Sequence, residues 1–100
     1  DQSNGRETLN ELLAQINVQL DELVIPANSD LVGTSIGTLE VRGKGSFIIV
    51  ALRRAEGEII IHPSQEIFLH EGDTLIVMGH RGDIPKFAKH HALKRQMQYR

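Results

Sequence analysis

The sequence predicts a small α+β domain, in which helices flank a mainly antiparallel β-sheet. Three segments rich in apolar and β-branched residues, Ser46–Arg54, Glu58–His62 and Thr74–Gly79, indicate strands. Turn signals separate these segments, and Gly57 supplies the residue that favours a positive φ in the first connection. A chain of 100 residues has room for one domain with a thin core, which self-association would help to stabilise.

The first part of the chain is expected to contain a helix, a strand and a second helix. Residues 1–19 are predicted to form an N-terminal linker helix, because apolar residues recur at helical spacing over 6–20. These apolar residues are Leu9, Leu12, Leu13, Ile16 and Leu20. Alternating residues predict a strand over Leu20–Pro26, and a short helix is expected over Ser35–Val41.

The C-terminal part is expected to contain one more helix, which begins near Asp83 with that residue as its cap. Pro85 is tolerated there because the first turn of a helix needs no backbone N–H donor. His91 belongs to the apolar stripe of this helix and is expected in the core or in an interface, whereas His90 is expected to face solvent. Residues 94–100 are predicted to be a basic tail.

The charges are distributed unevenly along the chain, although the net charge is only −2. Residues 1–80 contain 5 Lys/Arg and 12 Asp/Glu, whereas residues 81–100 contain 6 Lys/Arg and one Asp. The basic end is either a solvated helix face or a surface for phosphates or anionic lipid. The aromatic residues are scattered, so nucleic-acid binding is not predicted.

The composition and motifs argue against catalysis and against a metal site. The chain has no cysteine, which excludes disulfides and fits a reducing cytoplasm as well as export. None of its apolar runs approaches the roughly 20 residues that cross a bilayer. No serine lies in a nucleophile-elbow pattern, so an enzyme is not predicted. His90 and His91 would point about 100° apart on a helix, too far to share one metal ion.

Five segments occur in an order and at a spacing that resemble one known family. They are Leu23–Pro26, Ser29–Leu39, Ile48–Arg54, Ile61–Pro63 and Gly72–Gly79. Together they resemble the TrkA-C domain, the C-terminal lobe of the RCK module (regulator of potassium conductance). The resemblance covers about Leu20 to His91, and the domain is expected to span residues 20–93.

The resemblance implies a cytoplasmic regulatory domain that forms homodimers, alone or within a larger ring, and gates ion flux through a potassium channel or uptake system of the cell membrane. In this family the domain usually follows a nucleotide-binding Rossmann lobe and acts on a membrane pore or transporter subunit. No Gly-x-Gly-x-x-Gly fingerprint occurs here, so that lobe is expected upstream or on another chain. The alternatives are a purely structural dimerisation module that relays signals from the lobe, or a domain of a cation/proton antiporter.

Some TrkA-C dimers are receptors for cyclic di-AMP, so the resemblance also implies a ligand site in the cleft between two subunits. Arg53 and Arg54 are expected to supply cations for the two phosphates. Ile59, Ile61, His62 and Pro63, on the following strand, are expected to supply an apolar wall and a hydrogen-bond donor. The alternative is that the isoleucines form dimer core and that the arginines are surface charges. No other cofactor is expected in this chain.

Overall fold

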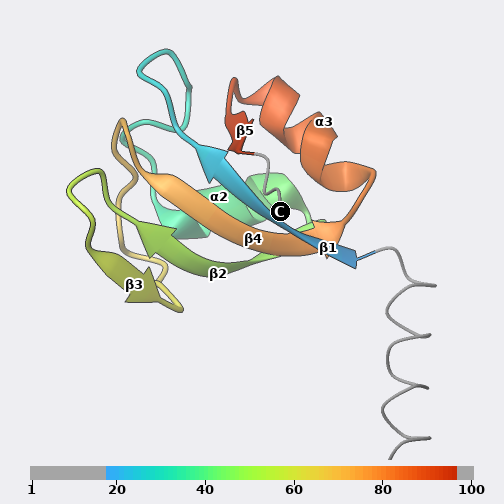
Figure 1. Ribbon diagram of the computed structural model, residues 1–100, viewed down its shortest axis with the longest axis horizontal. Coiled ribbons are helices and arrows are strands. Elements are labelled where there is room, and N and C mark those ends of the chain that lie inside the picture. Colours follow the sequence, from blue (N-terminus) through green and yellow to red (C-terminus); the bar gives the residue numbers. More distant parts are fainter. Residues whose placement is uncertain (1–17, 97–100) are drawn as a thin grey trace, which may run out of the picture.

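The structure, a computed structural model, describes residues 18–96. Its centre is a five-stranded antiparallel sheet with the strand order β3-β2-β4-β1-β5 (Figure 1). The strands are β1 (Val18–Val24), β2 (Phe47–Arg53), β3 (Ile59–Ile61), β4 (Thr74–His80) and β5 (Lys94–Gln96). The predicted α+β class with antiparallel pairing is confirmed.

The helix that follows β1 is α2 (Ile36–Gly43), close to its predicted bounds. It begins where the sequence suggests, because the side-chain oxygen of Ser35 accepts a hydrogen bond from the backbone N–H of Thr38 at 3.1 Å. It ends at Lys44, whose φ of 54° turns the backbone out of the helix. Arg42 and Gly43, at the end of this helix, line a cavity that is described below.

The second described helix is α3 (Asp83–His90). Gly82, not Asp83, occupies its N-cap position, and no side-chain hydrogen bond caps it. The prediction that Asp83 caps the helix was therefore wrong by one residue. A carboxylate in the first turn still interacts favourably with the helix dipole, and Pro85 lies in the first turn as expected.

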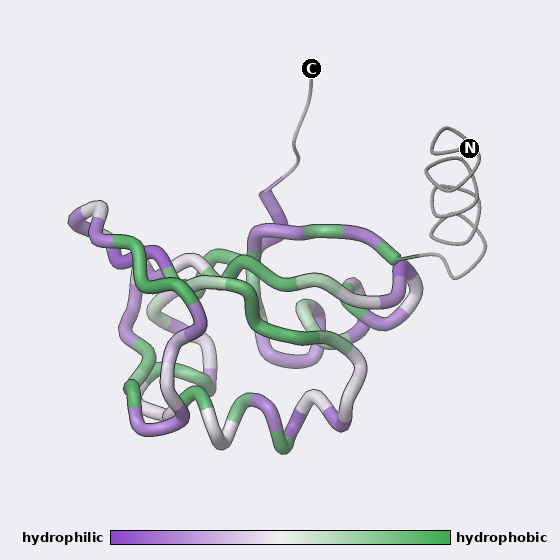
Figure 2. The backbone as a smooth tube through the Cα atoms, turned by 90° about the horizontal axis from the view of Figure 1, so that it is seen from below, coloured by the Kyte–Doolittle hydropathy of each residue, from purple (hydrophilic) through white to green (hydrophobic). Residues whose placement is uncertain are grey.

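The hydrophobic core lies between the sheet and the two helices, which pack on the same side of it (Figure 1). Its fully buried members are Leu23, Ile25, Leu31, Ile36, Leu39, Leu52, Leu69, Leu75, Val77 and Ile84. The hydropathy colouring shows the most hydrophobic stretches along the central strands and the hydrophilic residues mainly in the connections (Figure 2). One face of the sheet thus packs against the core, and the opposite face is not covered by the two helices.

The pairing of β2 with β4 is unusually close at one end. Gly79 lies opposite Phe47, and a Cβ at Gly79 would come within 2.6 Å of the Phe47 Cβ and still closer to the carbonyl oxygen of Ser46. Glycine is therefore required at this position. A register shift between Ile49 and Ala51 marks a bulge in β2 beside Val50.

Two of the predicted boundaries differ from the structure. The predicted helix over 6–20 lies outside the described residues up to residue 17, and Val18–Leu20 belong to β1, so the helical prediction was wrong for these last residues. Lys94–Gln96, predicted to begin a basic tail, form β5 and pair with Glu22–Val24. Within residues 18–96 no helix has the length and apolar character needed to cross a bilayer.

Candidate functional site

The β2–β3 hairpin brings three of the predicted ligand-binding residues onto one face of the sheet. Arg53 is the register partner of Ile59, and Ala51 is the partner of Ile61. Directly opposed residues of an antiparallel pair point to the same side, so Arg53 shares its face with the two isoleucines. Both isoleucine side chains are exposed. This outer face points away from the core and is available to a ligand or a partner.

Arg53 is held on the outer face by an ion pair. One of its guanidinium nitrogens donates to the Glu22 carboxylate of β1 at 3.0 Å, across the intervening strand β4. Both side chains are partly exposed. A guanidinium has five N–H donors, so this contact orients Arg53 and leaves donors for an anion. The role in phosphate binding that the sequence suggested for Arg53 stays a prediction.

His62 and Pro63 lie at the far end of the same hairpin. His62 has a φ of 51°, and its backbone N–H donates to the carbonyl oxygen of Val50 at 3.1 Å. Val50 is three residues before Arg53, so the two ends of the face are separated by about 10 Å. The outer face thus has a cation at the end nearest the hairpin turn and two exposed isoleucines beside it, and His62 and Pro63 follow directly after β3.

Arg54 does not join this group, although it was predicted to bind ligand. Its guanidinium donates to the Asp73 carboxylate at 2.6 Å and to the carbonyl oxygen of Phe68 at 3.0 Å. The side chain of Arg54 is 16% exposed and that of Asp73 only 2%. Asp73 also accepts the backbone N–H of His70. The structure therefore gives Arg54 a structural contact, because successive residues at the end of a strand point to opposite sides.

The outer face extends beyond the residues that were predicted. Leu20 and Ile48 are both register partners of Met78, so three apolar side chains from β1, β4 and β2 form a row. All three are exposed, Ile48 to 62%. We call Leu20, Ile48 and Met78 the apolar row. The sequence alone does not reveal this row, because it depends on the pairing register of β1, β4 and β2.

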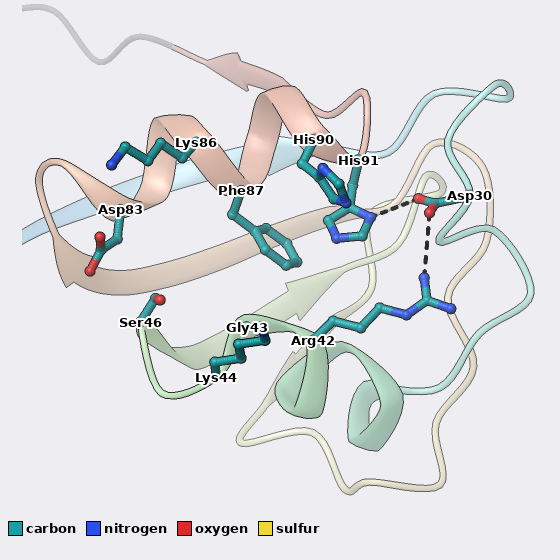
Figure 3. Close-up of a pocket in the computed structure, with 10 residues that line it drawn as sticks. All are labelled: Asp30, Arg42, Gly43, Lys44, Ser46, Asp83, Lys86, Phe87, His90 and His91. Carbon is teal, nitrogen blue, oxygen red and sulfur yellow. Dashed lines mark hydrogen bonds and ion pairs between the residues drawn. The ribbon is translucent and has the colours of Figure 1, made fainter.

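A second feature is a cavity of about 720 Å³ on the helical side of the molecule, between the end of α2 and α3 (Figure 3). At one end of it His91, which is buried as predicted, makes a hydrogen bond with Asp30 at 2.8 Å. Arg42 approaches the other Asp30 oxygen to 3.5 Å. The hydrogen bond with His91 is the main cause that lowers the pKa of the Asp30 carboxyl; burial opposes it as the next largest effect, and the charges of His91 and Arg42 lower the pKa further.

His90 is exposed, as predicted, and its ring meets the His91 ring edge-on at 4.7 Å between centroids. Among residues 18–96 no three His, Asp or Glu side chains are placed to hold a metal ion together. Neither histidine therefore belongs to a three-residue metal site in the described part of the chain.

Comparison with known proteins identifies the class of this domain. The TrkA-C domain model matches residues 20–92. The chain therefore belongs to the TrkA-C family, a family of regulatory domains without enzymatic activity, which confirms both the resemblance and the prediction that the chain is not an enzyme.

Among curated proteins, the Ktr system potassium uptake protein C of Bacillus subtilis (strain 168) is 40% identical over 65 residues. That alignment covers 65% of this chain and 29% of the relative, so the chain spans under a third of the length of this relative. The relative is thus a much longer protein that contains a domain of this kind.

Solved structures agree with this membership. The RCK C domain of the potassium transport protein KtrA, in complex with cyclic di-AMP, has a TM-score of 0.59 and 31% identity over 88% of this chain and 98% of that one. The RCK_C domain dimer of S. agalactiae BusR with cyclic di-AMP has a TM-score of 0.63 at 24% identity, over 74% and 97% of the two chains. The latter similarity shows the fold alone.

Proposed function

We propose that this chain is the dimerising regulatory domain of a potassium transport protein and that it binds cyclic di-AMP at the outer face of its β2–β3 hairpin. The observation that carries the proposal is the placement of Arg53, Ile59 and Ile61 on one exposed face, with His62 at its end. The complex of the KtrA domain with cyclic di-AMP supports the choice of ligand.

The chemistry of the face suits a cyclic dinucleotide. Arg53 supplies a fixed cation for a phosphate, and the His62 imidazole at the other end supplies a second hydrogen-bonding group. Ile59 and Ile61 offer an apolar wall against which a planar base can pack. The separation of about 10 Å between the two polar ends matches an extended ligand better than a single small ion.

A second copy of the chain would complete the site. The apolar row lies on the same outer face, and an exposed apolar patch of this kind is typical of a subunit interface. In a two-fold dimer each residue of the face occurs twice, so a two-fold ligand would meet Arg53 and His62 of both copies. Dimerisation and ligand binding are thus expected to use neighbouring parts of one surface.

The regulatory mechanism that follows is a shift in population. A ligand that binds one arrangement of the dimer more tightly biases an attached channel or transporter toward that arrangement. We infer that the domain works on the cytoplasmic side of the membrane, next to a Rossmann lobe and a pore or transporter subunit. The potassium uptake relatives, which are far longer than this chain, support this context.

The test is calorimetric titration of cyclic di-AMP into the chain and into an Arg53→Ala, His62→Ala double variant. We expect stoichiometric binding to the native dimer, with one ligand per two chains, and a loss of affinity of about 100-fold or more in the double variant, since two charge-assisted or polar contacts are removed from each copy. An Arg81→Ala, His70→Ala variant is the matched control, because it removes the same side-chain types from exposed positions outside both the outer face and the cavity.

Two results would overturn the proposal. One is retained affinity in the Arg53→Ala, His62→Ala variant while the control behaves as the native chain does. The other is a dimer whose melting temperature is unchanged by a large excess of cyclic di-AMP, since a ligand of the folded state must raise it. The second result would favour a purely structural dimerisation module.

A further inference from the structure

The cavity between α2 and α3 lies on the helical side of the sheet, away from the outer face. Phe87 lies between the two helices at the base of this cavity (Figure 3). Its ring packs on that of Phe47 at 4.8 Å and on that of His91 at 4.4 Å between centroids. Gly43 adds bare backbone to the wall, and the Phe47 ring leaves no room there for a side chain. The base of the cavity is therefore partly apolar and closely packed.

The rim of the cavity is rich in cations. Arg42 and Lys44 line it from the end of α2, and Lys86 and His90 line it from one face of α3. Their positions 86 and 90 are four apart, which places both side chains on the same side of the helix. Basic residues from two helices that are separate in the sequence thus line one cavity.

The acids at the cavity do not neutralise this set. Asp30 is already engaged by Arg42 and by His91, at 3.5 and 2.8 Å. Asp83 lies at the opposite end, in the first turn of α3. Among the ion pairs of residues 18–96, none involves Lys44 or Lys86. The two lysines therefore remain available for an anion.

The size of the cavity indicates the class of ligand. At about 720 Å³ it falls within the range of about 300–1,000 Å³ that is usual for small-molecule sites, and it is far larger than a bare phosphate ion needs. Lysine and arginine at the rim suit phosphate oxygens. The aromatic floor suits an organic group, which would cover apolar surface when bound.

The geometry points to a second ligand site in this cavity, which binds a phosphate-bearing organic molecule with its phosphate between Lys44 and Lys86 and its organic part over Phe87. This site is independent of the outer face, because the two lie on opposite sides of the sheet. The phosphate can belong to a soluble metabolite or to the headgroup of an anionic lipid, and both would use the same cations.

Two probes distinguish these sources. In the first experiment, ADP is titrated into the 100-residue chain at low ionic strength, and the backbone amide shifts in NMR spectra report binding. In the second, sedimentation of the chain with phosphatidylglycerol vesicles is compared with its sedimentation with phosphatidylcholine vesicles. A soluble source predicts saturable shifts centred on residues 42–46 and 83–91 with ADP. A lipid source predicts sedimentation with the phosphatidylglycerol vesicles alone.

The variants assign the binding to the cavity. A Lys44→Gln, Lys86→Gln variant is expected to weaken whichever interaction is observed by about tenfold or more, because two charge-assisted contacts are lost. Lys89→Gln is the matched control, since it removes the same charge from the same helix outside the cavity and is expected to change the affinity less than about twofold.

Three outcomes would overturn the second site. The first is the absence of both saturable ADP shifts and selective vesicle binding. The second is an equal loss of affinity in the Lys89→Gln control, which would show attraction to net charge alone. The third is a set of ADP shifts confined to the outer face, with Arg53→Ala and not the lysine variant weakening them.

Discussion

Arg53 of β2 and Glu22 of β1 form an ion pair at 3.0 Å, although strand β4 lies between them. The pair spans the outer face and fixes the guanidinium above β4. The next residue, Arg54, makes an ion pair with Asp73 that is much more deeply buried. Two adjacent arginines therefore lie in different surroundings, one on the outer face and the other largely buried against Asp73.

This difference predicts unequal effects of two neighbouring substitutions on the free energy of unfolding. Arg54→Ala leaves the buried Asp73 carboxylate without its cation and is expected to lower it by about 3 kcal/mol. Arg53→Ala breaks a partly exposed pair and is expected to lower it by no more than about 1 kcal/mol. Urea denaturation measures both. Equal losses in the two variants would contradict the assignment of separate roles.

The apolar row predicts the oligomeric state. Ile48→Ser is expected to weaken the dimer at least tenfold, by about 1.4 kcal/mol, while the monomer remains folded, because an exposed side chain contributes little to the core. Sedimentation equilibrium measures the dissociation constant and circular dichroism checks the fold.

Val41→Ser is the matched control for this experiment. Val41 is also an exposed β-branched residue, at 76%, but it lies on α2, on the helical side of the sheet. We expect no change in the dimer from this variant. If Val41→Ser dissociates the dimer and Ile48→Ser does not, the interface lies on the helical side instead.

The pair of Asp30 with His91 predicts a dependence of stability on acid pH. The pKa of the Asp30 carboxyl is lowered from its ordinary value of 3.8, chiefly by the hydrogen bond with His91. The ionised carboxylate therefore stabilises the fold above pH 3.8, and this contribution is lost as the pH falls through the lowered value.

Asp30→Asn is thus expected to lower the melting temperature near neutral pH and to make a progressively smaller difference below pH 3.8. The side chain of Asp30 is 59% exposed, so solvent screening keeps the effect small. Glu56→Gln, in the exposed β2–β3 turn, is the control and should change the melting temperature less near neutral pH, since none of the ion pairs found among residues 18–96 involves Glu56. A constant loss in Asp30→Asn across the acid range would contradict the role of the charge.

The close contact at Gly79 predicts a strong local requirement for glycine. Gly79→Ala is expected to lower the free energy of unfolding by about 2–3 kcal/mol, because the new Cβ would overlap Phe47 and force β2 and β4 apart. Gly82→Ala is the control, since its Cβ would meet no atom within 4 Å and its φ of −78° suits any residue. Thermal unfolding of both variants checks the contrast.

The sequence predicts the strands and helices that depend on local pattern. β2 and β4 are found because their β-branched and apolar runs differ from the turns around them. β5 is missed because Lys94, Arg95 and Gln96 have no strand pattern, and they become a strand through pairing with β1 and the ion pair of Arg95 with Asp21. Such pairing is a tertiary effect that a local pattern does not contain.

The candidate site was predictable in part for the same reason. Arg53, Ile59 and Ile61 could be grouped because a short hairpin connects them. The different role of Arg54 depends on Asp73, which is 19 residues away in the sequence, and the cavity depends on a contact between Asp30 and His91 over 61 residues. The apolar row required the register of three strands. These relationships arise from the folded topology.

The position of β1 inside the sheet has a mechanical consequence. β1 pairs with β4 along its whole length and with β5 at Glu22–Val24, so it is bonded on both sides near its end. A pull on the chain that precedes Val18, directed along this strand, would load those hydrogen bonds in shear, so many must yield together. A displacement upstream would therefore move this domain as one body before any strand is drawn out of it.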